Sequence, residues 1–350
     1  MPELEFLWRV HESPAQRLAL APLAAAELLY AAGARLHRLV YDAGWRRRTR
    51  LAAQVVSVGN LAVGGSAKTP VAAFLARELR ARGRKVALLS RGVGGRRTRG
   101  VNVVSDGERV LAAPADVGDE PCLLAAAAPG VPVLAGAERV AIGLRAIAAF
   151  GAEVLVLDDG FQHHPLERDV DLVCLDARLG LGNGHVLPRG PLREPPGALR
   201  RADALVWTRA EPGDPAPPGR DRLPAGLPEF RVALRKLGLR PLAGGERAPL
   251  ERLRGARVGL VAAIARPDRL ARDLDSLGAE VCARRVFADH HVYTPADLAG
   301  LDRELLWVTT AKDAVKIPPA WAGPAELVVL DEDVEREAAS ALVEFVASKL

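Results

Sequence analysis

Short apolar runs alternate with segments of helical periodicity along the first 210 residues of the chain. Six runs have the length of buried strands, at residues 55–58, 86–89, 131–134, 154–157, 172–175 and 204–207. Between them apolar residues recur at helical spacing, as Val71, Phe74, Leu75 and Leu79 do after Pro70. Strands that alternate with helices are typical of parallel βαβ units. We therefore expect an α/β fold with an open parallel sheet flanked by helices, whose ligands bind at the carboxyl ends of the strands.

A stretch rich in proline and glycine interrupts this pattern at residues 211–228 and is unfavourable for regular structure. Beyond it, apolar runs return at residues 230–234, 258–264, 305–309 and 327–330, and a helical pattern covers 334–349. We interpret the stretch as a linker between a core domain at 51–210 and a smaller C-terminal α/β domain at 229–350. A chain of 350 residues exceeds the size at which one core usually stops growing, so two domains are expected.

The first 50 residues form a separate N-terminal region, dominated by an apolar segment at 18–34 that Pro22 and Glu27 interrupt. A transmembrane helix needs about 20 predominantly apolar residues, and Glu27 near the middle argues against one. An amphipathic, membrane-associated helix in the plane of the surface fits better, because arginines that attract anionic headgroups follow it. A helix packed on the protein's own core is nearly as compatible with this segment alone. The arginines are Arg35, Arg38, Arg46, Arg47, Arg48 and Arg50.

Charge and cysteine content restrict the class of protein. The formal net charge of +5 suits an anionic substrate or a membrane surface, and no basic and aromatic cluster indicates nucleic-acid binding. Cys122, Cys174 and Cys282 lie far apart without a C-x-x-C spacing, which argues against a zinc site or a disulfide framework. A reducing, cytoplasmic setting follows, and the start of the chain lacks the basic segment of a secretory signal.

The segment between the first predicted strand and helix is typical of a phosphate-binding loop. Residues 57–70 read SVGNLAVGGSAKTP, which is a strand end, a loop of small residues and then Lys68-Thr69 at the start of a helix. In such a loop the backbone N–H groups form an anion site, the lysine reaches the β- and γ-phosphates, and the hydroxyl reaches Mg²⁺. The usual G-x-x-x-x-G-K-[ST] spacing fails at Ala62 and Ala67, because the glycines lie at 64 and 65. We favour a P-loop NTPase-like sheet over an ordinary glycine-rich turn, since strand and helix flank the loop as nucleotide binding requires.

Two acidic pairs are candidates for catalysis. Asp158 and Asp159 directly follow a predicted strand, where a phosphoryl-transfer enzyme needs a carboxylate for Mg²⁺; an ordinary Asp-Gly turn is the alternative. Asp119 and Glu120 precede a predicted helix, so either could be a general base or a metal-associated group, or simply an acid favoured by the helix dipole.

Three further segments carry charged side chains. The cluster Asp289-His290-His291 could accept a proton from a hydroxyl, or bind a metal less readily, because adjacent histidines do not easily face one ion. Arg193 could clamp a phosphate, although surface charge is a competitive explanation. Lys312 and Lys316 follow a predicted strand and could be simply solvated.

Together these segments resemble the tetraacyldisaccharide 4'-kinases, the lipid A 4'-kinases of Gram-negative bacteria. The resemblance covers almost the whole chain, because the displaced-glycine loop and six further motifs match in order, at residues 89–92, 117–121, 158–163, 190–194, 287–290 and 308–314. It implies ATP- and Mg²⁺-dependent phosphorylation of the 4'-hydroxyl of an acylated glucosamine disaccharide lipid, tetraacyldisaccharide 1-phosphate. It also implies peripheral or monotopic docking at the cytoplasmic face of the inner membrane, since a four-chain lipid cannot leave the bilayer cheaply.

The same resemblance assigns roles to individual residues. Lys68 would bind phosphates, Thr69 and Asp158 would serve Mg²⁺, and Asp119 paired with His290 would activate the sugar hydroxyl. The other loop residues expected at the nucleotide are Asn60, Gly64, Gly65, Ser66 and Ala67. Asp159 joins the catalytic set, and the supporting residues are Glu120, Arg139, His163, Arg193 and Glu194.

Ala67 departs from the family pattern, which has glycine before the lysine. If this position needs a positive φ, alanine costs about 1 kcal/mol. The alternatives are a P-loop kinase or GTPase for a soluble substrate, although no N-K-x-D motif of GTPases is present, and a membrane-associated nucleotide-binding scaffold. The intact Lys68, Thr69, Asp119, Asp158 and His290 oppose the scaffold, and neither nucleic acid nor a protein partner is expected.

Overall fold

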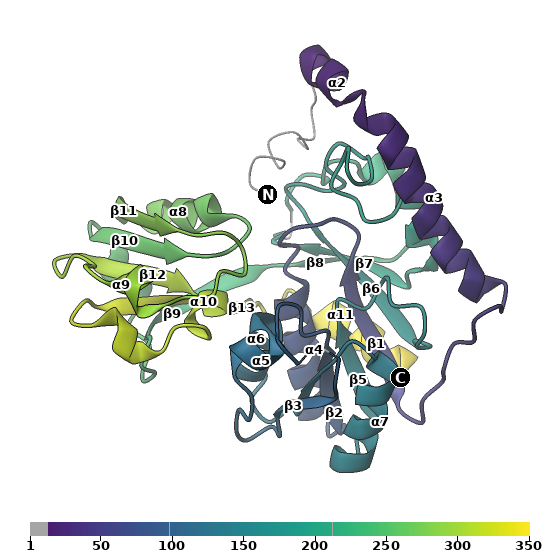
Figure 1. The fold of residues 1–350 in the computed structure, drawn as a ribbon, viewed down its shortest axis with the longest axis horizontal. Coiled ribbons are helices and arrows are strands. Elements are labelled where there is room, and N and C mark those ends of the chain that lie inside the picture. The colour runs from purple at the N-terminus through teal and green to yellow at the C-terminus, as the bar shows by residue number, and fades with distance from the viewer. Residues whose placement is uncertain (1–12, 98, 212) are drawn as a thin grey trace.

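The computed structural model describes residues 13–97, 99–211 and 213–350, which form two sheets side by side (Figure 1). Within these residues the larger sheet has eight strands in the order β3-β4-β2-β5-β1-β6-β7-β8. Every neighbouring pair is parallel except β3 with β4, which confirms the predicted open parallel sheet. The strands are β1 (Gln54–Asn60), β2 (Val86–Ser90), β3 (Asn102–Ser105), β4 (Val133–Ala135), β5 (Val154–Asp158), β6 (Val170–Asp176), β7 (Ala204–Thr208) and β8 (Glu229–Val232).

Helices cover both faces of the larger sheet, because successive side chains of a strand point to opposite faces. Val56 and Val156 pack with α4 (Lys68–Ala81) and α6 (Asp119–Ala127) on one face. Val55 and Leu155 pack with α7 (Arg139–Phe150) on the other. This two-sided burial explains why the strands are continuous apolar runs. The short α5 (Pro114–Val117) precedes α6, and the 3-10 helix η1 (Pro196–Arg201) precedes β7.

The smaller sheet has the strand order β11-β10-β12-β13-β9, with only β9 antiparallel to its neighbour within the described segments. The pattern did not predict β11, because this edge strand has no buried position and its apolar residues are interrupted by Arg284 and Arg285. The strands are β9 (Leu234–Pro241), β10 (Arg257–Ala262), β11 (Glu280–Val286), β12 (Leu306–Thr310) and β13 (Leu327–Val334). The helices are α8 (Pro267–Ser276), α9 (Pro295–Leu298), α10 (Ala311–Ala314), η3 (Leu250–Leu253) and η4 (Pro319–Ala322).

The chain changes sheets at a different place from the expected linker. The segment 211–228, which contains η2 (Arg220–Arg222), connects β7 to β8 within the larger sheet. The crossing to the smaller sheet comes between β8 and β9, and the chain returns after β13. The final helix α11 (Ser340–Lys349) then buries Leu342, Val343 and Val346 in the core of the larger domain. Both ends of the expected domain at 229–350 therefore belong structurally to the larger one, because their apolar side chains complete its core.

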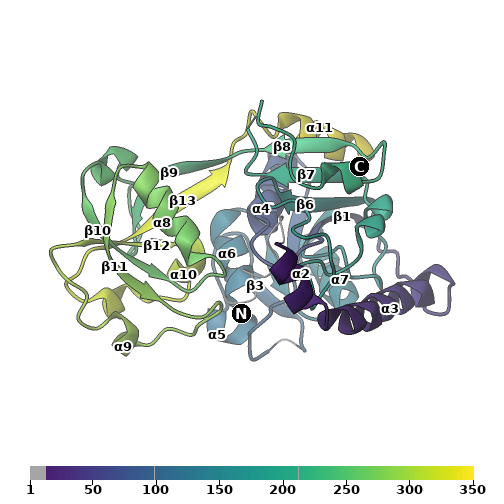
Figure 2. The same cartoon turned by 90° about the horizontal axis from the view of Figure 1, so that it is seen from above.

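The described part of the N-terminal region, from residue 13, consists of α2 (Pro14–Leu20) and α3 (Leu23–Asp42). Figures 1 and 2 show α3 lying along the larger domain on the side away from the smaller sheet. Within the described residues, no single helix is long and apolar enough to cross a membrane. The pair α2 and α3 meets the length and composition of a span together, but the two helices are bent by 64° at the break between them.

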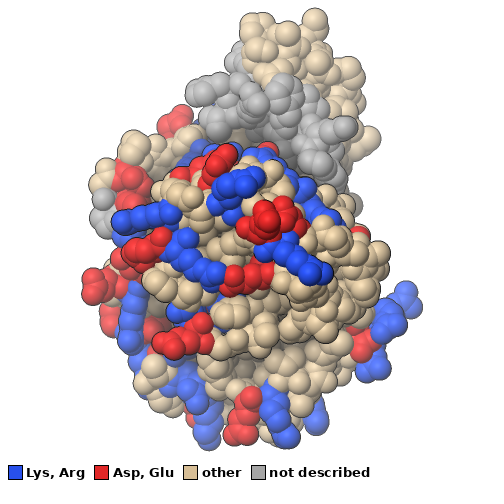
Figure 3. All heavy atoms as spheres, turned by 90° about the vertical axis from the view of Figure 1, so that its left-hand side faces the viewer, with Lys and Arg blue, Asp and Glu red and all other residues tan. Residues whose placement is uncertain are grey.

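The outer face of the smaller domain carries charges of both signs (Figure 3). On this face lysines and arginines alternate with aspartates and glutamates. Ion pairs within the smaller domain include Arg252 with Glu326 and Arg240 with Asp331. A surface of mixed sign offers no continuous positive stripe on the side that the figure shows.

Candidate active site

The predicted phosphate-binding loop joins β1 to α4, and two glycines set its path. A Cβ added to Gly59 would lie 2.5 Å from the Cβ of Phe161, so only glycine lets β1 approach the turn after β5 this closely. Gly64 has a φ of 100°, which favours glycine. Asn60 closes the strand end by donating its side-chain amide to the carbonyl oxygen of Ala62 at 2.7 Å. The loop therefore leads directly into the N-terminus of α4, whose first N–H groups are available to an anion.

Ala67, the residue that departs from the glycine pattern, is strained. It has a φ of 54° and a ψ of 26° at the N-cap of α4, and its side chain is buried. The left-handed region crowds an alanine Cβ at a cost of about 1 kcal/mol. Position 67 therefore has the positive φ at which alanine is less favourable than glycine.

We expect Ala67→Gly to lower the Michaelis constant for ATP by about two- to fivefold. A free-energy difference of up to about 1 kcal/mol corresponds to a change of this size in a binding constant. The physical reason is that glycine removes both the strain and the Cβ from the loop beside Lys68. Steady-state kinetics with varied ATP measures the constant. Ala62→Gly, at the other position where the usual spacing has glycine, is the matched control and should leave it unchanged. An equal constant for Ala67→Gly and the unaltered protein would contradict the expectation.

Asp158, the last residue of β5, faces the start of α4. The Thr69 hydroxyl donates a hydrogen bond to Oδ2 of Asp158 at 3.1 Å, and both side chains are buried. The other carboxylate oxygen, Oδ1, is buried without a hydrogen-bond partner. Burial raises the pKa of Asp158 to about 7, against the opposing effect of nearby Lys68. A buried carboxylate oxygen without a donor, next to a hydroxyl, fits the oxygen ligands that Mg²⁺ prefers.

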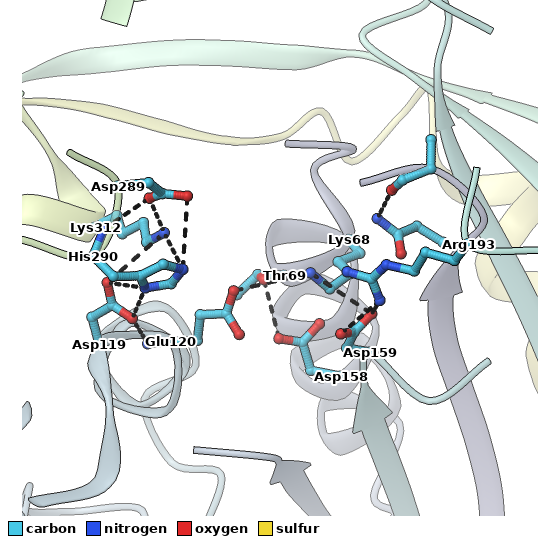
Figure 4. Close-up of polar contacts among 12 residues, drawn as sticks. Lys68, Thr69, Asp119, Glu120, Asp158, Asp159, Arg193, Asp289, His290 and Lys312 are labelled. Atoms are coloured by element: carbon cyan, nitrogen blue, oxygen red, sulfur yellow. Dashed lines mark hydrogen bonds and ion pairs between the residues drawn. The ribbon is translucent and has the colours of Figure 1, made fainter. Parts of the chain in front are cut away.

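Asp159 turns its carboxylate toward the cations of the loop (Figure 4). Nη1 of Arg193 donates to both of its oxygens, at 2.8 and 3.0 Å. Nζ of Lys68 lies 3.9 Å from Oδ1 of Asp159 and 4.0 Å from Oε1 of Glu120. Burial lowers the pKa of Lys68, but the carboxylates of Asp159, Asp158 and Glu120 outweigh it and raise the pKa above its ordinary value. Lys68 is therefore a fully charged ammonium at the phosphate loop.

The predicted proton-transfer pair is assembled from both domains. Asp119 begins α6 of the larger domain, and His290 follows β11 of the smaller one. Nδ1 of His290 lies 3.0 Å from each carboxylate oxygen of Asp119, so the carboxylate accepts a hydrogen bond from that nitrogen. In Figure 4 the pair lies on one side of Glu120, and Lys68, Thr69, Asp158 and Asp159 lie on the other. The structure therefore brings a carboxylate–imidazole pair and a phosphate loop to one site.

The electrostatics of the pair favour the charged forms of both partners. The hydrogen bond that His290 donates to Asp119 raises the pKa of His290 in spite of burial. Burial raises the pKa of Asp119, but the hydrogen bond with His290 and the charges of Lys312 and Lys316 outweigh it and lower the pKa. An imidazolium and a carboxylate thus stabilise each other across the domain interface.

Three of the expected supporting residues are not hydrogen-bonded to this centre in the described part of the chain, although the charge of Arg139 interacts with Asp158, Asp159 and Glu120. Arg139 is buried and donates to two backbone carbonyl groups, and burial lowers its pKa to about 10. Burial and neighbouring arginines lower the pKa of His163 to about 3, so this imidazole is neutral. Glu194 pairs with Arg201 at 2.6 Å, and the Arg201 guanidinium lies 3.6 Å from the ring centroid of Phe161. Arg201 also donates to the carbonyl oxygen of Phe161, so Glu194 supports the turn after β5 through Arg201.

Strained backbone is concentrated at this site. Among the residues that the structure describes, positive φ values at residues other than glycine occur at Ala67, Asp159, Arg209 and His290. Three of these belong to the loop, to the turn beside it or to the carboxylate–imidazole pair. Such conformations persist only where the surroundings enforce them, and they gather at functional sites. Their coincidence here is independent support for the location of the active site.

The family follows from a comparison with known proteins. A family model described as tetraacyldisaccharide-1-P 4'-kinase matches residues 17–350. This chain belongs to the tetraacyldisaccharide 4'-kinase family. The predicted family is thus confirmed, and with it a kinase of lipid A biosynthesis; a P-loop kinase for a soluble substrate is not favoured.

Individual members of the tetraacyldisaccharide 4'-kinase family are similar over most of their length. One from Anaeromyxobacter dehalogenans (strain 2CP-C) is 46% identical over 336 residues, which cover 91% of this chain and 86% of the relative. One from Geobacter metallireducens is 44% identical over 310 residues, 87% of this chain and 90% of the relative. A crystal structure of LpxK from Aquifex aeolicus in complex with ATP superposes with a TM-score of 0.77 at 30% identity, over 95% of this chain and 99% of that one.

Two residues that hold the phosphate loop of this tetraacyldisaccharide 4'-kinase family member were not identified from the sequence. The Thr208 hydroxyl donates to the carbonyl oxygen of Ser66 at 3.0 Å. Nη1 of Arg209 donates to the carbonyl oxygen of Gly65 at 2.8 Å and to Asp176 at 2.7 Å. Because C=O and N–H of a trans peptide point in opposite directions, the bond to Ser66 directs the N–H of Ala67 away from β7. Thr208 and Arg209 directly follow the predicted strand at 204–207, and this position was the one indication in the sequence that they could lie at the site.

A second omission concerns the segment after β12. Nζ of Lys312 and Nζ of Lys316 each lie 3.8 Å from Oδ2 of Asp119, so the two lysines belong to the site. Solvation was the interpretation that the sequence allowed, and it is wrong for Lys316, whose side chain is 7% exposed. Only the packing of α10 on α6 reveals the contact.

A cavity of about 370 Å³ lies under α3 and not at the phosphate loop. Its four arginines are matched by four carboxylates, so it has no excess of positive charge for an anion. The residues around the cavity are Arg38, Asp42, Arg48, His164, Leu166, Glu167, Arg168, Asp171, Arg201 and Asp203.

Across the described part of the chain, no group of three or more histidine, cysteine, aspartate or glutamate side chains could hold a metal ion.

Proposed function

We propose that this chain transfers the γ-phosphoryl group of ATP to the 4'-hydroxyl of tetraacyldisaccharide 1-phosphate. Membership of the family supports the reaction, and the ATP bound to the structural neighbour supports the donor. The observation that carries the assignment to residues is the Asp119–His290 pair next to Lys68 and Glu120. A phosphate loop alone would fit any nucleotide-binding protein, whereas a base beside it is positioned to activate a nucleophile, and family membership makes that nucleophile a sugar hydroxyl.

The phosphate loop and its cations bind and neutralise the triphosphate. The N–H groups at the start of α4 and the Lys68 ammonium hold the phosphates. The Thr69 hydroxyl and the Asp158 carboxylate would hold Mg²⁺, which would supply positive charge to the triphosphate. Asp159 keeps Arg193 and Lys68 in place through its bonds to both. Placement and charge neutralisation are the main catalytic effects in phosphoryl transfer.

The Asp119–His290 pair handles the proton of the acceptor. As the 4'-oxygen forms a bond to the γ-phosphorus, the bond from that phosphorus to the bridging oxygen of ADP breaks, and the hydroxyl proton passes to the pair. Asp119 is the base in this scheme, because its carboxylate is ionised, and the imidazole of His290 fixes its orientation.

Incubation of the purified protein with γ-labelled ATP, Mg²⁺ and the disaccharide lipid tests the proposal. We expect label in the lipid fraction, at the 4'-position of the sugar. Label that stays in water-soluble products, with none in the lipid, would contradict the lipid acceptor. A sample without protein gives the background.

We further propose that α3 docks on the cytoplasmic face of the inner membrane, where the acylated substrate lies. Leu28 and Leu29 on this helix are 71% and 76% exposed, and Trp45 just after it is 79% exposed. On the inner side, Oε1 of Glu27 accepts a hydrogen bond from the N–H of Val186 at 3.2 Å and lies 2.9 Å from Nδ1 of His185. The one acidic residue of the apolar segment is therefore tied to the protein, which leaves an apolar surface outward. Exposed leucines on the helix and an exposed tryptophan just after it favour an interfacial helix.

Flotation with vesicles that contain anionic lipid tests this docking. Leu28→Glu with Leu29→Glu should weaken vesicle binding at least about tenfold, because each buried leucine contributes about 1.5–3 kcal/mol. Leu237→Glu, an exposed leucine of β9 in the smaller domain, is the matched control. Equal vesicle binding by the double variant and the control would contradict the proposal that α3 docks on the membrane.

A further inference from the structure

Three cations of the smaller domain surround the Asp119 carboxylate of the larger domain. Besides His290, the ammonium groups of Lys312 and Lys316 each lie 3.8 Å from Oδ2 of Asp119. Lys312 belongs to α10, and Lys316 follows that helix directly. Figure 4 shows Lys312 reaching the pair from the same side as Asp289. On α6 itself the neighbouring titratable groups are Glu120 and Cys122, neither of which is a cation, so the positive groups described around this carboxylate all come from the other domain.

Lys316 is the more deeply placed of the two lysines. Its Nζ is buried without a hydrogen-bond partner among the described residues. It lies 3.0 Å from Oδ1 of Asp313 and 5.2 Å from the ring centroid of Tyr293. A buried ammonium is costly unless a carboxylate compensates it. Asp313 alone supplies that compensation, so the approach of Lys316 to Asp119 is an additional feature that a purely structural ion pair does not need.

Lys312 reaches both members of the proton-transfer pair. Its Nζ lies 3.8 Å from Asp119 and 3.5 Å from Nε2 of His290. It also donates to Oδ1 of Asp289 at 2.9 Å. One side chain thus connects the carboxylate, the imidazole and the loop that carries the imidazole.

We propose that Lys316 and Lys312 are positioning residues that keep Asp119 ionised and fixed, so that the general base is complete only when the two domains are docked. This inference rests on the proposed phosphoryl transfer and deepens it, because it gives the segment after β12 a part in regulating the site. A positive charge within about 4–6 Å favours the ionised form of a carboxylate. The groups around Asp119 are His290, Lys312 and Lys316 from the smaller domain, with Asp289 in contact with two of them, and Glu120 and Cys122 from its own helix.

Matched variants separate this role from the structural one. Lys316→Met alone would leave Asp313 buried without its cation, and the domain could fail to fold. The double variant Lys316→Met with Asp313→Asn removes both charges and keeps the side-chain volumes similar. Lys312→Gln is a second, more exposed test, and Lys349→Met on α11 is a control for the loss of a lysine.

The pKa of Asp119 can be measured without turnover, from its carboxyl carbon by NMR in the full-length protein. We expect Lys312→Gln and the double variant to raise this pKa by about one unit or more. Lys349→Met should leave it unchanged. Because a base is inactive when protonated, the acid limb of kcat/KM for lipid phosphorylation should move to higher pH in the same variants.

The two readouts distinguish failure of this inference from failure of the proposed function. An unchanged Asp119 pKa in both test variants would overturn the role of the lysines, even if the lipid is phosphorylated. Absence of lipid phosphorylation by the unaltered protein would overturn the proposed function, while a raised Asp119 pKa in the variants would still support the electrostatic relation.

Discussion

Asp119→Asn is expected to lower the rate of lipid phosphorylation by about 10²–10⁴-fold, the usual contribution of a positioned acid–base group. Asparagine keeps the shape of the side chain and accepts a hydrogen bond from His290, but it cannot take up the hydroxyl proton. The rate is measured with γ-labelled ATP and the disaccharide lipid. The matched control is Asp297→Asn, which alters the other aspartate–histidine contact of the same region, 3.1 Å from Nε2 of His291. Equal losses in both variants would contradict a special role for Asp119.

The same variant makes a prediction about pH. Asp119 raises the pKa of His290 above its ordinary value of 6.5, so NMR titration of the imidazole should show a lower pKa in Asp119→Asn. The contribution of His290 to stability is complete below 6.5 and is lost as pH rises through its raised pKa. The contribution of Asp119, whose pKa is lowered from 3.8, is present above 3.8 and is lost as pH falls through its lowered pKa. The ion pair therefore stabilises the docked domains most between these two values.

Lys68→Met is expected to reduce phosphoryl transfer by about 10²–10³-fold, as removal of one positioned charge donor does in other transferases and hydrolases. Methionine fills the space of the side chain but leaves Asp159 and Glu120 facing the phosphates without their shared cation. Both kcat and the Michaelis constant for ATP should deteriorate. Lys85→Met, an exposed lysine before β2, is the control and should behave like the unaltered protein. Retained activity in Lys68→Met would contradict the proposed role of this lysine in phosphoryl transfer.

The sequence was most informative where local pattern and chemistry coincide. The six apolar runs of the larger sheet became strands because both faces of that sheet are buried, and Lys68, Thr69 and Asp158 meet because parallel strands end at one edge. The pairing of Asp119 with His290 came from the family resemblance, since the two residues are 171 positions apart and no local pattern connects them.

Other features depend on contacts that a linear pattern does not contain. The role of β8 in the larger sheet and of α11 in its core is set by long-range packing, so the proline- and glycine-rich stretch was a misleading boundary. Strand β11 is an edge strand with half-exposed side chains, and its arginines obscured it. Lys316 is buried because α10 packs on α6. Arg209 directly follows β7, which is separated from β1 and its phosphate loop by β6, and it donates to the carbonyl oxygen of Gly65 in that loop.

Three of the four strained residues restrict where this protein can be stabilised against heat. Glycine at any of them would relax the backbone, and substitutions that relieve strain are a common route to higher melting temperatures. Ala67 has no reactive group, so that position is open to improvement. At Asp159, Arg209 and His290 the same change would remove a carboxylate, a guanidinium and an imidazole that contact the proposed site. Selection for thermal tolerance should therefore accumulate substitutions at other positions. These three residues should stay unchanged, although their backbone conformations lower the stability of the protein.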